Sequence, residues 1–324
     1  MTETSPAGPQ IAPPVPPPPR AYPTSARQDR QGTAILLICG ASLIFAMQDG
    51  ISRHLGTQYS PIFITMLRYW FFTLFVVAIC LRQPGGLRAA IRSRRPWTQI
   101  ARGVILALEI VVTVEAFVRL GLINTHAIFA CYPLMISILS GPVLGEKVGW
   151  RRWLAVFVGF LGILIVLKPG SGVFSSQAAL PLLAAVMFAA YGLMTRLVGR
   201  DDSALTSFLW TSVIGAITMT LLGLRSWQPI ATADLPWLLI LCACAGTAHF
   251  MLIRAYELAE ASALQPFSYT QLVWVSIFAV VIFGERLAPN VALGAAVVVG
   301  AGLFTWWRSR QQGAARHRAR VHRA

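Results

Sequence analysis

Charged residues are scarce in this sequence, and their scarcity excludes an ordinary soluble domain. Only 12% of the 324 residues are charged, whereas 56% are hydrophobic. A chain of this composition has too few polar side chains to cover a folded surface in water. We therefore expect an integral membrane protein whose apolar outer surface faces the lipid bilayer.

Cysteine is also rare, and its placement argues against a disulfide framework. All five cysteines fall inside apolar runs, where they act as small core residues: Cys39, Cys80, Cys131, Cys242 and Cys244. Neither His126 nor His249 has metal-ligand spacing with another histidine, cysteine or acid. The sequence thus predicts no metal and no cofactor.

Motifs of catalysis are missing as well. The apolar runs hold no His-Glu-x-x-His, no Gly-x-Ser-x-Gly and no paired aspartates, which argues against an intramembrane protease or transferase. A filter-like loop is absent too, which argues against a channel. A protein that is not an enzyme is therefore predicted.

The positive charge of the chain does not indicate nucleic-acid binding. The formal net charge is +15, from 25 Arg and 2 Lys against 12 acidic residues. These charges cluster at the ends of the apolar runs and are not interleaved with aromatic residues. Such clusters are typical of membrane topology signals, so no nucleic-acid partner is expected.

Ten apolar runs follow one another, each about as long as the roughly 20 residues that a 30 Å hydrocarbon core requires. They cover residues 33–52, 61–81, 99–120, 122–144, 149–168, 178–197, 204–224, 235–256, 262–284 and 289–307. Residues 1–32 form a Pro-rich arm without the apolar stretch of a cleavable signal, and residues 308–324 form a basic tail. The fold class predicted is all-α, with ten transmembrane helices.

The basic residues between the runs predict the orientation. On one side of the membrane lie 20 Lys and Arg residues, including those of the arm and the tail, and on the other side lie 5. Basic residues gather on the cytoplasmic side. Both termini should therefore be cytoplasmic, which requires an even number of spans in this multi-pass protein.

The second half of the sequence repeats features of the first. Gly145-Glu146-Lys147 at the end of the fourth run matches Gly284-Glu285-Arg286 at the end of the ninth, a shift of 139 residues. Phe45-Ala46 and Arg53 find counterparts in Phe188-Ala189 and Arg196, a shift of 143 residues. Two copies of five spans must lie in opposite orientations, the inverted-repeat arrangement of many transporters. The repeats would occupy residues 33–168 and 178–307.

These features resemble the EamA-type carriers of the drug/metabolite transporter superfamily. In both halves the Gly-Glu-Lys/Arg end precedes a glycine-bearing fifth helix, with Gly159 and Gly162 or Gly294, Gly300 and Gly302. The resemblance implies a bacterial inner-membrane carrier that moves a small metabolite through a central cavity by alternating access. The stretches from Gln48 to Leu55 and from Arg68 to Phe72 look most like bacterial riboflavin importers, which implies riboflavin uptake. Uptake of S-adenosylmethionine and efflux of amino acids or other metabolites are the alternatives within the same fold.

Charged residues inside the runs are the first candidates for the transport site, because a charge in mid-membrane is costly. Glu109 lies near the centre of the third run, either as a substrate or proton group or as the partner of Arg68. Asp49, Arg68 and Glu115 are candidates for a coupling or counter-charge role. Asp49 is alternatively a local partner of Arg53, and Glu115 the partner of Arg119 in a helix-terminal ion pair.

Deep aromatic and amide side chains are the second set of candidates, because they suit a flat heterocycle. The predicted substrate-binding set contains Gln48, Glu109, Tyr132, Tyr191, His249, Tyr269, Gln271 and Trp274. Tyr132-Pro133 and Gln265-Pro266 should interrupt their helices at matching positions, either along the substrate path or as packing kinks. Gly141, Gly145 and Gly149 favour close helix packing first and a homodimer interface second.

Overall fold

The computed structural model describes residues 24–146, 150–167, 178–297, 299–301 and 303–304, and the regular structure in these ranges is entirely helical. The helices are α1 (Thr24–Gly56), α2 (Pro61–Leu81), α3 (Gly86–Ile91), α4 (Pro96–Leu120), α5 (Leu122–Phe129), α6 (Tyr132–Leu144), α7 (Trp150–Leu167), α8 (Ala179–Val198), α9 (Ala204–Gly223), α10 (Leu235–Leu258), α11 (Ala261–Ser268) and α12 (Thr270–Phe283). A last helical segment lies within Pro289–Ala301.

Helix starts coincide with prolines, because the first turn of a helix does not need the missing N–H group. Pro61 and Pro96 lie in the first turns of α2 and α4. Helix α1 begins at Thr24, directly after the last proline of the head and before the predicted start at residue 33. Residues 1–23 of the predicted arm and the predicted tail, 308–324, lie outside the described residues.

Seven helical stretches of the described chain are long and apolar enough to cross a membrane. Two of them join a pair of short helices, α5 with α6 and α11 with α12. Helix α4 falls outside this set and is less apolar, since it carries Arg102 and Glu109. Length and hydropathy therefore support an all-helical membrane protein.

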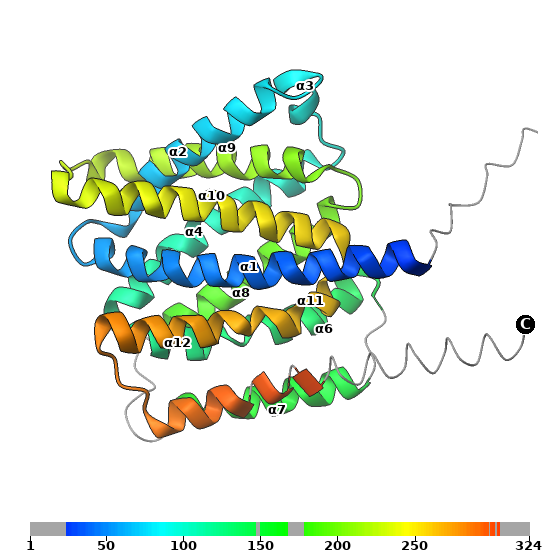
Figure 1. Cartoon of the computed structure of the whole chain (residues 1–324), viewed down its shortest axis with the longest axis vertical. Helices are drawn as coiled ribbons and strands as arrows, with labels where there is room; N and C mark the ends of the chain where they lie inside the picture. Colours follow the sequence, from blue (N-terminus) through cyan, green and yellow to red (C-terminus); the bar gives the residue numbers. More distant parts are fainter. Residues whose placement is uncertain (1–23, 147–149, 168–177, 298, 302, 305–324) are drawn as a thin grey trace, which may run out of the picture.

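Helices from the two halves of the chain pack against each other. Helix α1 lies between α10 and α12, and α4 packs on α8 and α9 (Figure 1). The start of α1 and the end of the last helical segment lie toward the same end of the bundle (Figure 1). The core is thus built by both halves together, and neither half encloses it alone.

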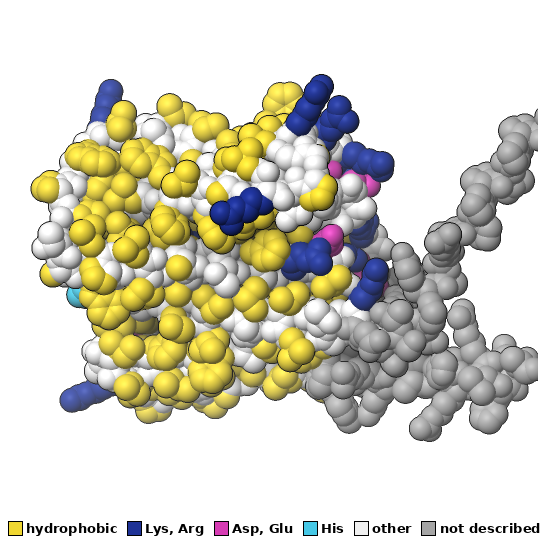
Figure 2. Space-filling model, turned by 45° about the horizontal axis from the view of Figure 1, so that its top comes forward, with side chains coloured by type: hydrophobic (Ala, Val, Ile, Leu, Met, Phe, Trp, Pro, Cys, Tyr) yellow, Lys and Arg dark blue, Asp and Glu magenta, His cyan; other side chains and the backbone are white. Residues whose placement is uncertain are grey.

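The flank of the bundle is apolar. Figure 2 shows hydrophobic side chains over most of this flank, with most of the visible charged side chains gathered toward one end. Leu36, Leu74, Leu221 and Val281 each leave 72–80% of their surface exposed. Lipid tails would cover such side chains, in agreement with the membrane protein that the composition predicts.

Both runs with a predicted break are interrupted, but only the first break lies at the predicted residues. Helix α5 ends at Phe129 and α6 begins at Tyr132, so Pro133 lies in a first turn. In the second pair, Pro266 lies inside α11, and the break follows three residues later at Tyr269. Each break interrupts a run that would otherwise be one membrane-spanning helix, and such breaks are tolerated where protein or cavity water covers the freed backbone groups.

The Gly-Glu sequences end α6 and α12 with the same geometry. Gly145 and Gly284 have positive φ angles of 69° and 63°, which glycine adopts without the steric cost of a Cβ atom. Gly145 therefore serves as a helix cap, and Gly149 lies outside the described residues. A homodimer built on these glycines stays a prediction.

Arg102 is the centre of a buried polar network among the helices. Its guanidinium is fully buried and donates to Gln99 Oε1 at 2.7 Å, to Thr195 Oγ1 at 2.9 Å, and to the Ser207 carbonyl and Thr211 Oγ1. Gln99 in turn donates to Asp202 at 2.9 Å. This network joins α4 to α8 and α9 and accounts for the charge of Arg102 within the bundle.

We expect Arg102→Met to destabilise the fold by about 3 kcal/mol or more, because it leaves several buried acceptors without a donor. The measurement is thermal unfolding of the protein in detergent. Arg119→Met is the matched control: Arg119 is half exposed and pairs only with Glu115 at 2.6 Å, so its loss should cost about 0–1 kcal/mol. Equal unfolding temperatures for the two variants would contradict this role of Arg102.

Candidate functional site

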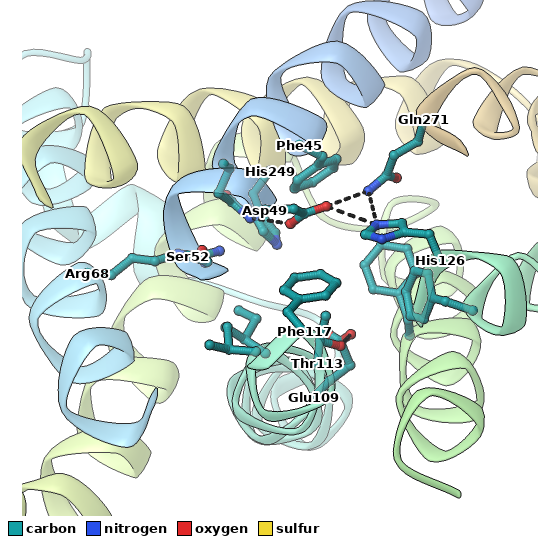
Figure 3. A pocket seen from close by; sticks show the side chains of 15 residues that line it. Phe45, Asp49, Ser52, Arg68, Glu109, Thr113, Phe117, His126, His249 and Gln271 are labelled. Atoms are coloured by element: carbon teal, nitrogen blue, oxygen red, sulfur yellow. Dashed lines mark hydrogen bonds and ion pairs between the residues drawn. The ribbon is translucent and has the colours of Figure 1, made fainter. Parts of the chain in front are cut away.

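A cavity lies between the helices, and the side chains that line it point into it from several of them (Figure 3). Seven helices line it: α1, α2, α4, α5, α8, α10 and α12. The lining residues are Phe45, Gln48, Asp49, Ser52, Arg68, Glu109, Ile110, Thr113, Val114, Phe117, His126, Phe129, Phe188, His249 and Gln271. The cavity has a volume of about 40 Å³, which is room for about three water molecules.

Asp49 is the centre of a polar cluster in this cavity. Its Oδ2 atom accepts a hydrogen bond from Gln271 Nε2 at 3.0 Å and lies 3.1 Å from His126 Nε2. The other carboxylate oxygen is 3.5 Å from Gln48 Nε2. Figure 3 shows the Asp49 carboxylate facing both Gln271 and His126, so α1, α5 and α12 meet at this carboxylate.

Arg68 and Glu109 add two more charges to the cavity wall. Glu109 accepts a hydrogen bond from Thr113 Oγ1 at 2.6 Å, one turn further along α4. Arg68 is 4% exposed, and no described side chain forms an ion pair or hydrogen bond with its guanidinium. A buried cation that faces a cavity without a partner is an uncommon and costly arrangement, which marks it as a candidate ligand group.

Two buried acceptors in the cavity also lack partners. His249 Nδ1 donates to the Ala245 carbonyl at 3.0 Å, which leaves Nε2 as an acceptor in the neutral ring. Neither His249 Nε2 nor Gln48 Oε1 has a hydrogen-bond partner among the described residues. Both atoms are therefore available to donors on a bound solute.

Four phenylalanines supply the apolar part of the wall. Phe45 meets the His249 ring edge-on with centroids 4.9 Å apart, and Phe117 stacks on His126 at 5.1 Å with an interplanar angle of 7°. Phe129 and Phe188 lie 5.5 Å apart. Aromatic walls with a few directed polar groups are the usual composition of a site for a flat solute.

The structure brings together six of the eleven residues singled out from the sequence: Gln48, Asp49, Arg68, Glu109, His249 and Gln271. Three tyrosines are buried but do not line the cavity: Tyr132, Tyr191 and Tyr269. Of these, Tyr132 packs edge-on against Phe188 at 4.8 Å, and Tyr191 lies under the Arg102 guanidinium at 5.5 Å. They support the wall from behind.

Glu115 and Trp274 are not brought to the cavity. Glu115 is one third exposed and pairs with Arg119 four residues away, the alternative that the sequence left open. Trp274 is 36% exposed on the flank of α12. Conversely, the predicted binding set missed His126 and the four phenylalanines. The signal for His126 was its position as a polar residue within an apolar run.

The end of the bundle next to the cavity is held by Glu285. This carboxylate pairs with Arg53 and accepts the backbone N–H groups of Leu122 and Ile123 at 2.8 and 2.9 Å. Gly121, with a φ angle of 80°, leaves the space for it, since a Cβ atom there would lie 2.9 Å from Glu285 Oε1. The end of α12 is thereby joined to α1 and to the start of α5.

The equivalent residues at the opposite end are loosely joined. Glu146 is within 3.4 Å of the backbone N–H of Ser262 at the start of α11, and its Oε1 atom is buried without a partner. Arg196 donates to the Tyr256 carbonyl at 2.9 Å, whereas its Nε atom has no described partner. One end thus has a complete ion pair, and the matching groups at the other end are incompletely paired.

Among the described residues, no group of three histidine, cysteine or acidic side chains is placed to hold a metal ion. What the cavity offers is one cation, two carboxylates, two imidazoles and two amides on aromatic walls. This arrangement can bind and orient a small polar molecule.

Comparison with known proteins agrees with a transport role. The EamA-like transporter family matches residues 32–168 and again residues 176–307. The chain is 27% identical over 285 residues to the riboflavin transporter of Vibrio cholerae, covering 87% of this chain and 95% of that protein. It is 23% identical over 272 residues to an S-adenosylmethionine uptake transporter of Rickettsia prowazekii, covering 84% and 92%.

Two further relatives extend this similarity. The riboflavin transporter of Rhizobium johnstonii is 30% identical over 217 residues, covering 67% of this chain and 72% of that protein. One solved crystal structure shares the fold with a TM-score of 0.61 and 18% identity, covering 89% of this chain and 99% of that one. The chain therefore belongs to the EamA-like transporter family and is a multi-pass membrane transporter of small molecules.

Proposed function

We propose that this protein is a secondary carrier of the bacterial inner membrane that takes up riboflavin by alternating access. In this proposal ten spans form two five-helix repeats of opposite orientation, over residues 33–168 and 178–307, and both termini are cytoplasmic. The Glu285 end of the cavity then faces the outside, and the Glu146 end faces the cytoplasm. The carrier works without a cofactor and binds one solute between its two repeats.

Two observations support the repeats. The family matches the chain twice, over two segments of similar length. The helix ends at Gly145-Glu146 and Gly284-Glu285 also have the same hydrogen bonds: Glu146 N–H donates to the Ser140 carbonyl at 3.1 Å, and Glu285 N–H donates to the Ala279 carbonyl at 3.0 Å. Five spans per repeat, an odd number, give these matching ends opposite orientations.

The observation that carries the substrate proposal is Arg68, which lines a cavity together with four phenylalanines and forms no ion pair or hydrogen bond with a described side chain. One ring of the flavin has two carbonyl groups with an N–H between them, and the fused ring system is flat and aromatic. The guanidinium of Arg68 can donate to those carbonyls, while His249 Nε2 and Gln48 Oε1 can accept from ring N–H groups or from the sugar-alcohol hydroxyls. The phenylalanines supply stacking surfaces.

The size of the cavity supports alternating access. Space for about three water molecules is too small for a three-ring solute. Binding then requires helices to separate at one end. The complete Arg53–Glu285 pair supports a closed outer end, and the incompletely paired Arg196 and Glu146 support an inner end that is easier to open.

S-adenosylmethionine uptake is the second candidate, and the two carboxylates of the cavity favour it. Asp49 and Glu109 can face the sulfonium and ammonium groups of that solute, while Arg68 binds its carboxylate. The S-adenosylmethionine uptake transporter of Rickettsia prowazekii is one of the proteins to which this chain is similar. The two candidates differ in charge, since riboflavin is neutral and S-adenosylmethionine carries a net positive charge.

Uptake by cells tests the proposal. Expressed in a riboflavin-auxotrophic bacterium, the protein should restore growth on low external riboflavin and give saturable uptake of labelled riboflavin. Excess unlabelled riboflavin should block this uptake, and S-adenosylmethionine should not. No rescue despite verified membrane expression, with saturable uptake of labelled S-adenosylmethionine instead, would assign the protein to the second candidate.

A further inference from the structure

The contact between Asp49 and His126 requires a proton. His126 Nδ1 lies 3.1 Å from the Leu122 carbonyl, which can only accept, so this nitrogen carries a hydrogen. In the neutral ring His126 Nε2 would then present a lone pair to Asp49 Oδ2 at 3.1 Å. Two facing lone pairs repel, and one proton between them, on either atom, turns the contact into a hydrogen bond.

We propose that this Asp49–His126 pair is the proton-coupling site of the transporter, an inference that rests on the transport function proposed above. The proton lies on the axis between His126 Nε2 and Asp49 Oδ2, and it is gained from one side of the membrane and lost to the other. Histidine suits this task because its ordinary protonation range lies close to neutral pH.

The surroundings hold the pair in place in both charge states. Gln271 Nε2 donates to Asp49 Oδ2 at 3.0 Å and lies 3.5 Å from His126 Nε2, so the amide can favour whichever atom bears the lone pair. The Phe117 ring stacks on the imidazole with centroids 5.1 Å apart, which fixes the plane of the His126 ring. Both side chains are less than 10% exposed, so the proton is shielded from bulk water.

The charges of the cavity connect this proton to the substrate. The ionisable groups that face the pair are Arg68 on α2, Glu109 on α4 and His249 on α10; α8 and α12 contribute Phe188 and Gln271, which do not titrate. The formal charges of Arg68 and Glu109 cancel. While Arg68 and Glu109 are both ionised, the Asp49–His126 pair sets the net charge of the cavity, which is zero with the proton and one negative charge without it.

Closing a cavity around an unbalanced charge is costly in a medium of low polarity. With a neutral solute such as riboflavin, the cavity closes without net charge only when the proton is present. Substrate and proton then cross in the same direction. A solute with one positive charge has the opposite requirement. It neutralises the single negative charge of the cavity only when the proton is absent.

Purified protein in liposomes tests whether a proton moves. The liposomes contain a pH-sensitive dye, riboflavin is added outside, and the membrane potential is clamped with potassium and valinomycin. We expect internal acidification together with riboflavin entry, and accumulation approaching tenfold for an inward gradient of one pH unit at one proton per solute. Riboflavin entry with neither acidification nor accumulation would overturn the proton site and leave the proposed function standing. If riboflavin does not enter, and S-adenosylmethionine enters without acidification, the riboflavin assignment is overturned. That result would still agree with a closed cavity that must have no net charge.

Asp49→Asn assigns the proton to this pair. The asparagine amide can donate to His126 Nε2, so the contact persists although residue 49 can no longer gain or lose a proton. Because the variant can also lose turnover, riboflavin binding in detergent is measured by quenching of its fluorescence. The dissociation constant for riboflavin of the unmodified protein should rise by up to tenfold per pH unit as the pair loses its proton, and that of Asp49→Asn should not change with pH.

The matched control Glu115→Gln, outside the cavity, should keep the full pH dependence. A variant Asp49→Asn with the same pH dependence as the unmodified protein would overturn the assignment.

Discussion

Arg68→Gln is expected to raise the riboflavin concentration for half-maximal uptake by about ten- to hundredfold. The guanidinium is buried in the cavity wall without a partner among the described residues, so the substrate would be its partner. A hydrogen bond to a charged group contributes about 1.5–3 kcal/mol, which corresponds to this range. The measurement is the concentration dependence of labelled riboflavin uptake at equal membrane expression.

Two further variants separate a ligand role of Arg68 from a structural one. Arg68→Lys keeps the charge but loses the planar fork of donors, and it should give an intermediate loss. If Arg68 served only to balance Glu109, removing both charges would repair the defect. Recovery of normal uptake in the double variant Arg68→Gln/Glu109→Gln would therefore contradict the ligand role.

Glu285→Ala is expected to open the outer end of the cavity. This carboxylate joins α12 to Arg53 of α1 and to two backbone N–H groups of α5, and alanine replaces none of these contacts. Loss of several charge-assisted hydrogen bonds should shift the equilibrium between the closed and the open outer end by at least tenfold toward the open one. The native cysteines are replaced, and Ser52→Cys introduces one thiol in the cavity wall. The measurement is the rate at which an impermeant thiol reagent, added outside, labels this thiol.

The matched control for this experiment is Glu146→Ala at the opposite end. Among the described residues the Glu146 carboxylate accepts one long hydrogen bond, from Ser262 N–H at 3.4 Å, and it lies on the cytoplasmic side in the proposed topology. Its loss should leave labelling of Ser52→Cys from outside unchanged. Equal labelling of the Glu285→Ala and unmodified Glu285 proteins would contradict closure by this carboxylate.

Much of the helical layout is predictable because its determinants are local. The apolar run 61–81 coincides with α2, and 204–224 ends one residue after α9. Proline and glycine mark these ends, and hydrophobicity marks the interiors. The short α3 (Gly86–Ile91) was not predicted, since a helix of six residues leaves no hydropathy signal. The early start of α1 was missed for a related reason, because a helix can continue past its apolar part with polar residues.

The candidate site was predictable only where burial itself is costly. Asp49, Arg68 and Glu109 stand out because charges rarely occur within apolar runs. His126 gave a weaker signal, since its partner Asp49 is 77 residues away in sequence. The depth of Trp274 in its run suggested a site residue, but depth does not fix which way a helical side chain faces. Gln271 faces the cavity, whereas Trp274 lies on the flank.

The central claim is that one cavity, lined by Arg68 and Asp49, opens alternately to the two sides of the membrane. Counterflow in proteoliposomes tests it most directly. Vesicles loaded with unlabelled riboflavin should take up external labelled riboflavin faster than empty vesicles, and the effect should saturate and be lost in Arg68→Gln. Entry that rises linearly with concentration, independent of internal riboflavin and unchanged in Arg68→Gln, would contradict a carrier built around this cavity.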